Sequence, residues 1–120
     1  MSFIYRHVEL IRVIDGDTAV LSVDMGNKMK WVENFRLYGI DTPERGEQGA
    51  LEATEFLKST LLDGLSRIET FKPDKFGRWL VDIYIAVDGG EMNVNQMMIT
   101  EGLAKPYFGG AKASAVPITL

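Results

Sequence analysis

Carboxylates and arginines, two kinds of side chain suited to phosphate chemistry, gather in three short segments of this sequence. The segments are Asp15–Thr18, Arg36–Arg45 and Asp74–Arg78. Aspartate and glutamate supply hard oxygen ligands for Ca²⁺ or Mg²⁺, and arginine binds phosphate through two parallel hydrogen bonds without losing its charge. Phosphodiester hydrolysis needs a cation on the phosphate, a carboxylate that accepts a proton from water, and fixed positive charge for the transition state. In combination, the three segments indicate this kind of chemistry.

Each segment also has a purely structural interpretation. Asp15-Gly16 is a common hairpin signal, in which glycine permits a tight turn. Asp41 or Thr42 followed by Pro43 is typical of the first turn of a helix. The third segment, taken alone, is typical of a polar turn between strands.

Length and composition predict one globular domain spanning residues 1–120. The chain is 46% hydrophobic and 25% charged and has no cysteine, which excludes a disulfide framework and a thiolate metal site. We find neither an export signal at the amino terminus nor a membrane-length apolar stretch. We therefore expect a cytoplasmic protein for the sequence as it stands, and a longer exported precursor stays open.

The net charge of −4 argues against a protein whose main task is to coat nucleic acid. Sequence-independent affinity for nucleic acid comes from lysines and arginines that neutralise phosphates. The charge disfavours a stand-alone domain that protects single strands, and it favours a local site that binds, cuts and releases.

Alternation of apolar and polar residues predicts five strands. They are Phe3–Ile14, Thr18–Asp24, Lys28–Ile40, Arg67–Phe71 and Trp79–Val87. Within the third strand, Trp31, Phe35 and Leu37 share one face, so Arg36 must point to the other.

The apolar period changes to that of a helix over Gln48–Leu62, with Gly64 ending the helix. Its apolar stripe consists of Ala50, Ala53, Leu57 and Leu61. A second helix is predicted from Asn93, its N-cap, to Glu101, with Gly102 as C-cap. This order predicts an α+β, mainly β fold: a five-stranded OB-type β-barrel with two or three short helices.

Four segments together resemble the successive signature segments of the staphylococcal-nuclease-like (thermonuclease) family. These segments are Val13–Thr18, Phe35–Glu44, Asp74–Arg78 and Gly102–Lys105. They occur in the family's order at similar intervals, and the resemblance covers the chain from about Val8 to Tyr107.

The resemblance implies a calcium-dependent nuclease that hydrolyses DNA and RNA and leaves 3′-phosphate ends. The implied Ca²⁺ ligands are Asp17, Asp41 and the main-chain carbonyl of Thr42. Glu44 is implied to activate the attacking water, while Arg36 and Arg78 hold the scissile phosphate.

The resemblance also implies contacts to the substrate. Lys75 and Phe76 match positions of the family's nucleotide pocket, and Tyr107 or Phe108 would stack on a base. The loop after Glu44 is short compared with that of the family's founding member, which puts the mobility of the loop and the catalytic rate in question.

The alternative function is a catalytically inert OB module of the same family that binds nucleic acid or protein. Inert copies are expected to lack one or more of the five charged site residues, and all five are present here. We expect a monomer that does not associate with membranes. The preference between DNA and RNA, and between internal and terminal cleavage, stays open.

Overall fold

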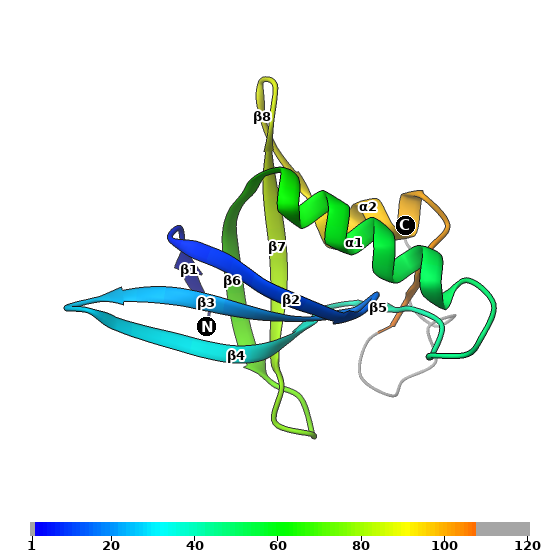
Figure 1. Ribbon diagram of the computed structural model, residues 1–120, viewed down its shortest axis with the longest axis horizontal. Coiled ribbons are helices and arrows are strands. Elements are labelled where there is room, and N and C mark those ends of the chain that lie inside the picture. The colour runs from blue at the N-terminus through cyan, green and yellow to red at the C-terminus, as the bar shows by residue number, and fades with distance from the viewer. Residues whose placement is uncertain (1, 108–120) are drawn as a thin grey trace.

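The structure is a computed structural model and describes residues 2–107 (Figure 1). Most of the secondary structure in these residues is β-strand. The strands are β1 (Phe3–Tyr5), β2 (Val8–Asp15), β3 (Thr18–Gly26), β4 (Met29–Leu37), β5 (Ile40–Asp41), β6 (Leu65–Pro73), β7 (Trp79–Val87), β8 (Gly90–Asn93) and β9 (Lys105–Pro106). The helices are α1 (Ala50–Gly64) and α2 (Val94–Thr100).

The main sheet has the strand order β1-β6-β7-β4-β3-β2, with β8 added to β7. Its pairs are antiparallel except for β4 and β7, which run parallel. The hydrogen-bonded path does not close into a ring. However, the strands at its two edges, β1 and β2, follow each other in the chain. The continuous segment β1–β2 therefore connects the two edges of a barrel-like sheet. The expected mainly β, OB-type class is confirmed.

All five predicted strands are present, although two are interrupted. Residues 6–7 separate β1 from β2, and Tyr38-Gly39 separates β4 from β5. Gly39 has a φ of 80°, a left-handed conformation that ends the regular strand. The short strands β8 and β9 were not predicted, since neither shows a clear apolar alternation.

The barrel core forms where the strand alternation predicted it. Phe35 and Leu37 are fully buried, and Trp31 packs against the same cluster, edge-on to Phe35. Arg36, between the two buried residues, faces away from the core with its side chain only 12% exposed. Strand β4 therefore buries its apolar face and presents an arginine on the other face.

Helix α1 lies across one end of the sheet (Figure 1) and buries the predicted stripe of Ala50, Ala53, Leu57 and Leu61. The interpretation of Asp41 or Thr42 as a helix cap is wrong, because residues 42–49 form a loop and the N-cap of α1 is Gly49. This loop leaves the polar groups of residues 41–44 available for a site.

Helix α2 begins at the predicted N-cap, Asn93, but it ends one residue earlier than predicted, at Thr100, with Glu101 and not Gly102 as its C-cap. The Asn93 side chain accepts a hydrogen bond from the backbone N–H of Gln96, and Gly102 adopts a φ of 76° after the last turn. A buried side chain, Asn95, ties this helix to the sheet by donating to the backbone carbonyls of Tyr38 and Val81 and accepting from Ile83. Helix α2 thereby fixes the junction between β4 and β5.

Candidate active site

The hairpin turn between β2 and β3 places Asp17 in a buried position beside the loop after β5. One Asp17 carboxylate oxygen accepts a hydrogen bond from the Thr18 hydroxyl, and the other accepts one from the Thr42 backbone N–H at 3.2 Å. The turn is thus both a hairpin, as its sequence predicted, and part of the site.

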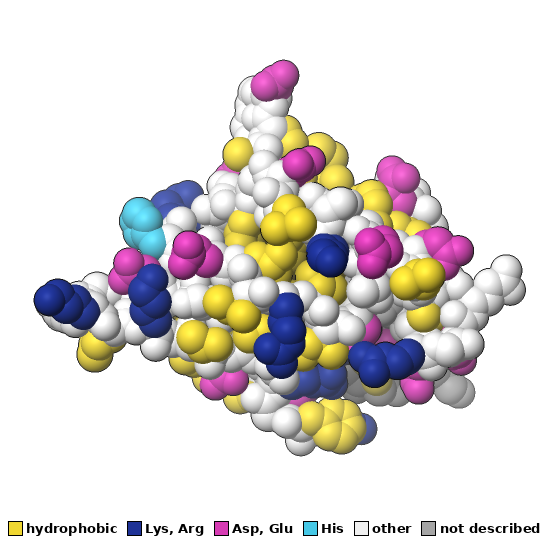
Figure 2. Space-filling model, viewed as in Figure 1, with side chains coloured by type: hydrophobic (Ala, Val, Ile, Leu, Met, Phe, Trp, Pro, Cys, Tyr) yellow, Lys and Arg dark blue, Asp and Glu magenta, His cyan; other side chains and the backbone are white. Residues whose placement is uncertain are grey.

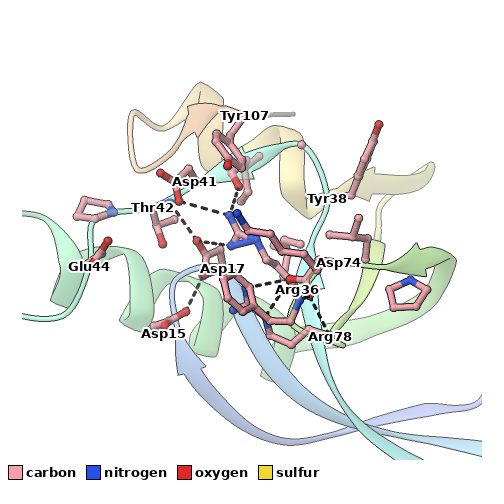
Figure 3. A pocket seen from close by; sticks show the side chains of 18 of the residues that line it. Asp15, Asp17, Arg36, Tyr38, Asp41, Thr42, Glu44, Asp74, Arg78 and Tyr107 are labelled. Carbon is pink, nitrogen blue, oxygen red and sulfur yellow. Dashed lines mark hydrogen bonds and ion pairs between the residues drawn. The ribbon is translucent and has the colours of Figure 1, made fainter. Parts of the chain in front are cut away.

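Arg36 joins the two aspartates that the sequence predicted as metal ligands (Figure 3). Its Nη1 lies 3.1 Å from Asp17 Oδ2, and its Nη2 lies 3.3 Å from Asp41 Oδ1. Nη2 also donates to the Ile40 carbonyl at 3.1 Å. Two carboxylates from different elements therefore converge on one guanidinium group.

Arg78, at the end of the β6–β7 loop, is held by Asp74 in the same loop. Asp74 Oδ2 accepts a hydrogen bond from Arg78 Nε at 3.0 Å and forms an ion pair with Nη2 at 2.9 Å. The other carboxylate oxygen accepts from the backbone N–H groups of Phe76 and Arg78. Because guanidinium has five N–H donors, three remain outside this pair for a phosphate.

Burial and hydrogen bonding act oppositely on the ionisation of the two flanking aspartates. Partial burial would raise the pKa of Asp74, but the two backbone hydrogen bonds and the charge of Arg78 outweigh it and lower the pKa below its ordinary value. Burial raises the pKa of Asp15, and the Asp17 carboxylate adds to this effect. The turn of β2 and β3 therefore concentrates negative charge that favours a cation.

One cleft of about 1010 Å³ brings the three segments together. Its lining includes all six residues of the predicted catalytic and metal sites: Asp17, Arg36, Asp41, Thr42, Glu44 and Arg78. Glu44 lies on the loop before α1, at one end of the group drawn in Figure 3 and apart from the Arg36 pairs. Its backbone N–H donates to the Glu47 side chain at 2.7 Å, which orders the loop at this residue.

The residues predicted to contact substrate line the same cleft where the structure describes them. Phe76 is 72% exposed, with the Arg78 and Lys75 cations each 5.4 Å from its ring centre. Tyr107 lies with its ring centre 5.8 Å from Arg36 Cζ, and its backbone N–H donates to the Gly39 carbonyl. Phe108 lies outside the described residues.

Sequence reasoning missed the roles of Asp74 and Asp15 in this site. Both were treated as turn residues, although the spacing of Asp74 and Arg78, four residues apart across a glycine, was a usable signal for the ion pair. The convergence of Asp17 and Asp41 on Arg36 had no local signal, because it depends on the pairing of β3 with β4.

The donor set at Asp17, Asp41 and Thr42 fits a hard divalent cation. Calcium sites use carboxylate and main-chain carbonyl oxygens as ligands. Here the two carboxylates lie close together, since both contact Arg36, and the third donor would be a carbonyl oxygen of an irregular loop. Within residues 2–107, no three His, Cys, Asp or Glu side chains are arranged as a metal cluster by themselves. A cation here would therefore rely on backbone oxygen and water as well as on the two aspartates.

The fold and the cleft define a mainly β, OB-type protein with a cleft lined by arginines and carboxylates. The sequence model of the family described as staphylococcal nuclease homologue matches residues 34–115. The chain belongs to this staphylococcal-nuclease-like family.

Several curated relatives carry names that state an activity, and two of them are described here. An "Uncharacterized endonuclease" of Escherichia coli O157:H7 is 36% identical over 101 residues, which cover 84% of this chain and 61% of the relative. The "Thermonuclease" of Staphylococcus hyicus is 36% identical over 108 residues, covering 83% of this chain and 59% of the relative. The chain thus spans about 60% of the length of these relatives.

Among the described residues, neither helix is long and apolar enough to cross a membrane.

Proposed function

We propose that this protein is a nuclease that hydrolyses phosphodiester bonds of DNA and RNA with Ca²⁺ as its metal and leaves 3′-phosphate ends. The observation that supports the proposal most strongly is the single cleft in which Asp17, Asp41, Glu44, Arg36 and Arg78 meet. The names of the family and of its curated relatives agree with a nuclease.

Each charged side chain has a distinct task in the proposed reaction. Asp17, Asp41 and the Thr42 carbonyl would hold Ca²⁺, which supplies positive charge to a non-bridging phosphate oxygen. Glu44 accepts a proton from the attacking water, and Arg36 and Arg78 bind the phosphate oxygens on which negative charge accumulates. The bond from phosphorus to the 5′ oxygen breaks, so the phosphate stays on the 3′ side.

The ion pairs in the cleft support separate roles for the two arginines. Arg36 bridges both aspartates and so lies beside the proposed metal position. Arg78 is oriented by Asp74 of its own loop and lines the same cleft as Arg36. A phosphate between them would meet positive charge on two sides, as a dianionic transition state requires.

The direct test is to incubate purified protein with denatured plasmid DNA and with RNA, in Ca²⁺, in Mg²⁺ and in a chelator. We expect degradation in Ca²⁺, little in Mg²⁺ alone and none in chelator, because Ca²⁺ accepts an irregular oxygen shell that octahedral Mg²⁺ resists. The products should prime DNA synthesis only after phosphatase treatment. Equal degradation in chelator would contradict the metal mechanism.

Two substitutions separate the enzyme from the inert OB module. Glu44→Gln should lower the rate by about 10² to 10⁴ while nucleotide still binds. Arg78→Ala should lower kcat by up to roughly 10³ to 10⁵, with a smaller change in affinity. Glu55→Gln, on the exposed side of α1, is the matched control and should retain wild-type turnover. Wild-type protein that binds oligonucleotide but never cuts it would favour the inert module.

A further inference from the structure

Tyr38, which lines the cleft, packs its ring against Phe71, and neither ring has a task in the proposed reaction. Their ring centres are 5.0 Å apart at an angle of 44°, and Tyr38 lines the cleft with 38% of its surface exposed. In Figure 3, Tyr38 and Glu44 lie at opposite ends of the labelled group, with Arg36 between them. Tyr38 therefore lies on the side of Arg36 away from the proposed base.

The backbone of Tyr38 is fixed at both of its polar groups. Its N–H donates to the Val81 carbonyl at 2.8 Å, and its carbonyl accepts from the buried Asn95 amide at 2.9 Å. Leu37, the preceding residue, is fully buried, so Arg36 and Tyr38 both face away from the core along the same stretch of chain. A ring on so rigid a support, backed by Phe71, loses little freedom when a flat ligand stacks on it.

Positive charge accompanies the aromatic pair. Lys72, which follows Phe71 in β6, lines the cleft, as does Lys75. An exposed aromatic face beside lysines is the combination that binds one nucleotide of a single strand, with its base stacked and its phosphate neutralised.

We propose that Tyr38, supported by Phe71, is a stacking subsite for a nucleobase next to the scissile phosphate, with Lys72 beside the adjoining phosphate. This inference rests on the proposed function for its substrate. It adds an aromatic contact to those expected of Phe76 and Tyr107 in the same cleft. The subsite contributes affinity for nucleotides beyond the one that is cut.

The test uses oligothymidylates of two to six nucleotides that carry a terminal phosphate. Binding is measured by competition against a fluorescent oligonucleotide in the Glu44→Gln background, so that the probes are not consumed. When one added nucleotide reaches Tyr38, affinity should rise roughly 5- to 100-fold, because stacking of a base on an aromatic side chain increases affinity by about this factor. We call this increase between two successive lengths the step. The step should disappear in Tyr38→Leu and persist in Tyr38→Phe, which keeps the ring.

Two controls separate stacking from charge and from misfolding. An abasic unit at the same step adds a phosphate but no base, so it should give less than a third of the gain. Tyr84→Leu removes a tyrosine that packs on Arg67, outside the cleft lining, and should leave the step in place. Thermal unfolding checks that each variant folds.

Survival of the step in folded Tyr38→Leu, or the full gain from an abasic unit, would overturn the subsite. If wild-type protein shows the step but never cuts any oligonucleotide, the subsite stands and the nuclease proposal fails. If wild-type protein binds none of the probes, both proposals are overturned.

Discussion

The two oxygens of the Asp74 carboxylate bind different partners. One oxygen binds the backbone N–H groups of Phe76 and Arg78, which shapes the loop, and the other binds the Arg78 guanidinium. In an amide only one of these atoms accepts hydrogen bonds, so a single substitution separates the shape of the loop from the orientation of the arginine.

Asp74→Asn should lower kcat roughly 10- to 100-fold, the equivalent of one lost hydrogen bond between charged groups. Nuclease assays at saturating substrate measure the effect, with Asp88→Asn in the exposed β7–β8 turn as the control. Because the pKa of Asp74 is lowered in the folded state, its contribution to stability is present above the unfolded pKa and is lost as pH falls through the folded one. Unchanged kcat in the variant would show that Arg78 needs no help from Asp74.

Asp82, on the outer face of β7, is a carboxylate that the fold tolerates poorly. Partial burial raises its pKa, the opposing Glu69 on β6 raises it further, and a hydrogen bond from Asn93 offsets part of the effect. A pKa raised in the folded state means stability that is greatest below the unfolded pKa and is lost as pH rises through the folded one.

Asp82→Asn should therefore stabilise the protein at pH 7 by about 0.5 kcal/mol, the usual scale for a cross-strand charge pair. The gain should vanish near pH 3, where the wild-type carboxyl is protonated. Urea unfolding at both pH values measures the difference. An equal gain at the two pH values would show that charge is not the cause.

At the residue scale, the sequence predicted the identity of the site side chains but not their partners. Arg36 could be placed on the polar face of its strand because Phe35 and Leu37 alternate with it. Its simultaneous contact with Asp17 and Asp41 depends on how β3, β4 and the following loop meet, which no local pattern records.

At the scale of elements, the β2–β3 turn packs directly against helix α1. A Cβ atom at Gly16 would lie 2.7 Å from Ala53 Cβ and 3.0 Å from the Thr42 side chain. The sequence explained this glycine by the freedom of its backbone, but Gly16 is absent from the glycines with positive φ. Glycine is required at position 16 because the turn lies so close to Ala53 and Thr42. This proximity depends on how the turn packs against helix α1, which no local sequence pattern records.

Gly16→Ala should destabilise the protein by roughly 1–3 kcal/mol through overpacking, and it should weaken Ca²⁺ binding because Thr42 must move. In an Ala53→Gly background, the same substitution should cost much less, since the nearest atom is gone. Thermal unfolding of the four proteins in this double-mutant cycle measures the coupling. Additive losses would mean that the Gly16 contact is not the cause.

The charges of the whole molecule set how strongly it can hold a polyanion. Lysines, arginines and carboxylates are intermixed over the face in Figure 2, without a broad basic surface on that side. The cleft lining contains as many cations as carboxylates. The five cations are Arg36, Arg45, Lys72, Lys75 and Arg78, and the five carboxylates are Asp15, Asp17, Asp41, Glu44 and Asp74. Nucleic acid should therefore be held locally and released readily.

Binding of an eight-nucleotide single strand should consequently depend only moderately on salt. With at most five cleft cations on phosphates, the slope of log K against log salt should be no steeper than about −3.5. Fluorescence anisotropy of the Glu44→Gln variant between low and moderate salt measures the slope. A slope near −5, about the limit for the seven phosphates of this strand, would reveal a basic surface outside the cleft.

The class of the fold was predictable from strand alternation, but the order of the strands was not. The parallel neighbours β4 and β7 are separated in sequence by α1 and β6, and β1 pairs with β6 through partners such as Phe3 and Thr70. Contacts between such distant segments leave no local signal in composition or period.

The pairing of β1 with β6 also has a consequence for synthesis on the ribosome. The hairpins of β2, β3 and β4 can form early in an emerging chain, but β1 has no partner until residues 68–70 have emerged. Arg78 is made later still, and the strand that pairs with Asp41 begins at Lys105. A nascent chain therefore holds its aspartates long before its second arginine, and the complete cleft cannot assemble while the chain is shorter than 107 residues. Translation thus delays this cleft until the segment described here is almost fully made.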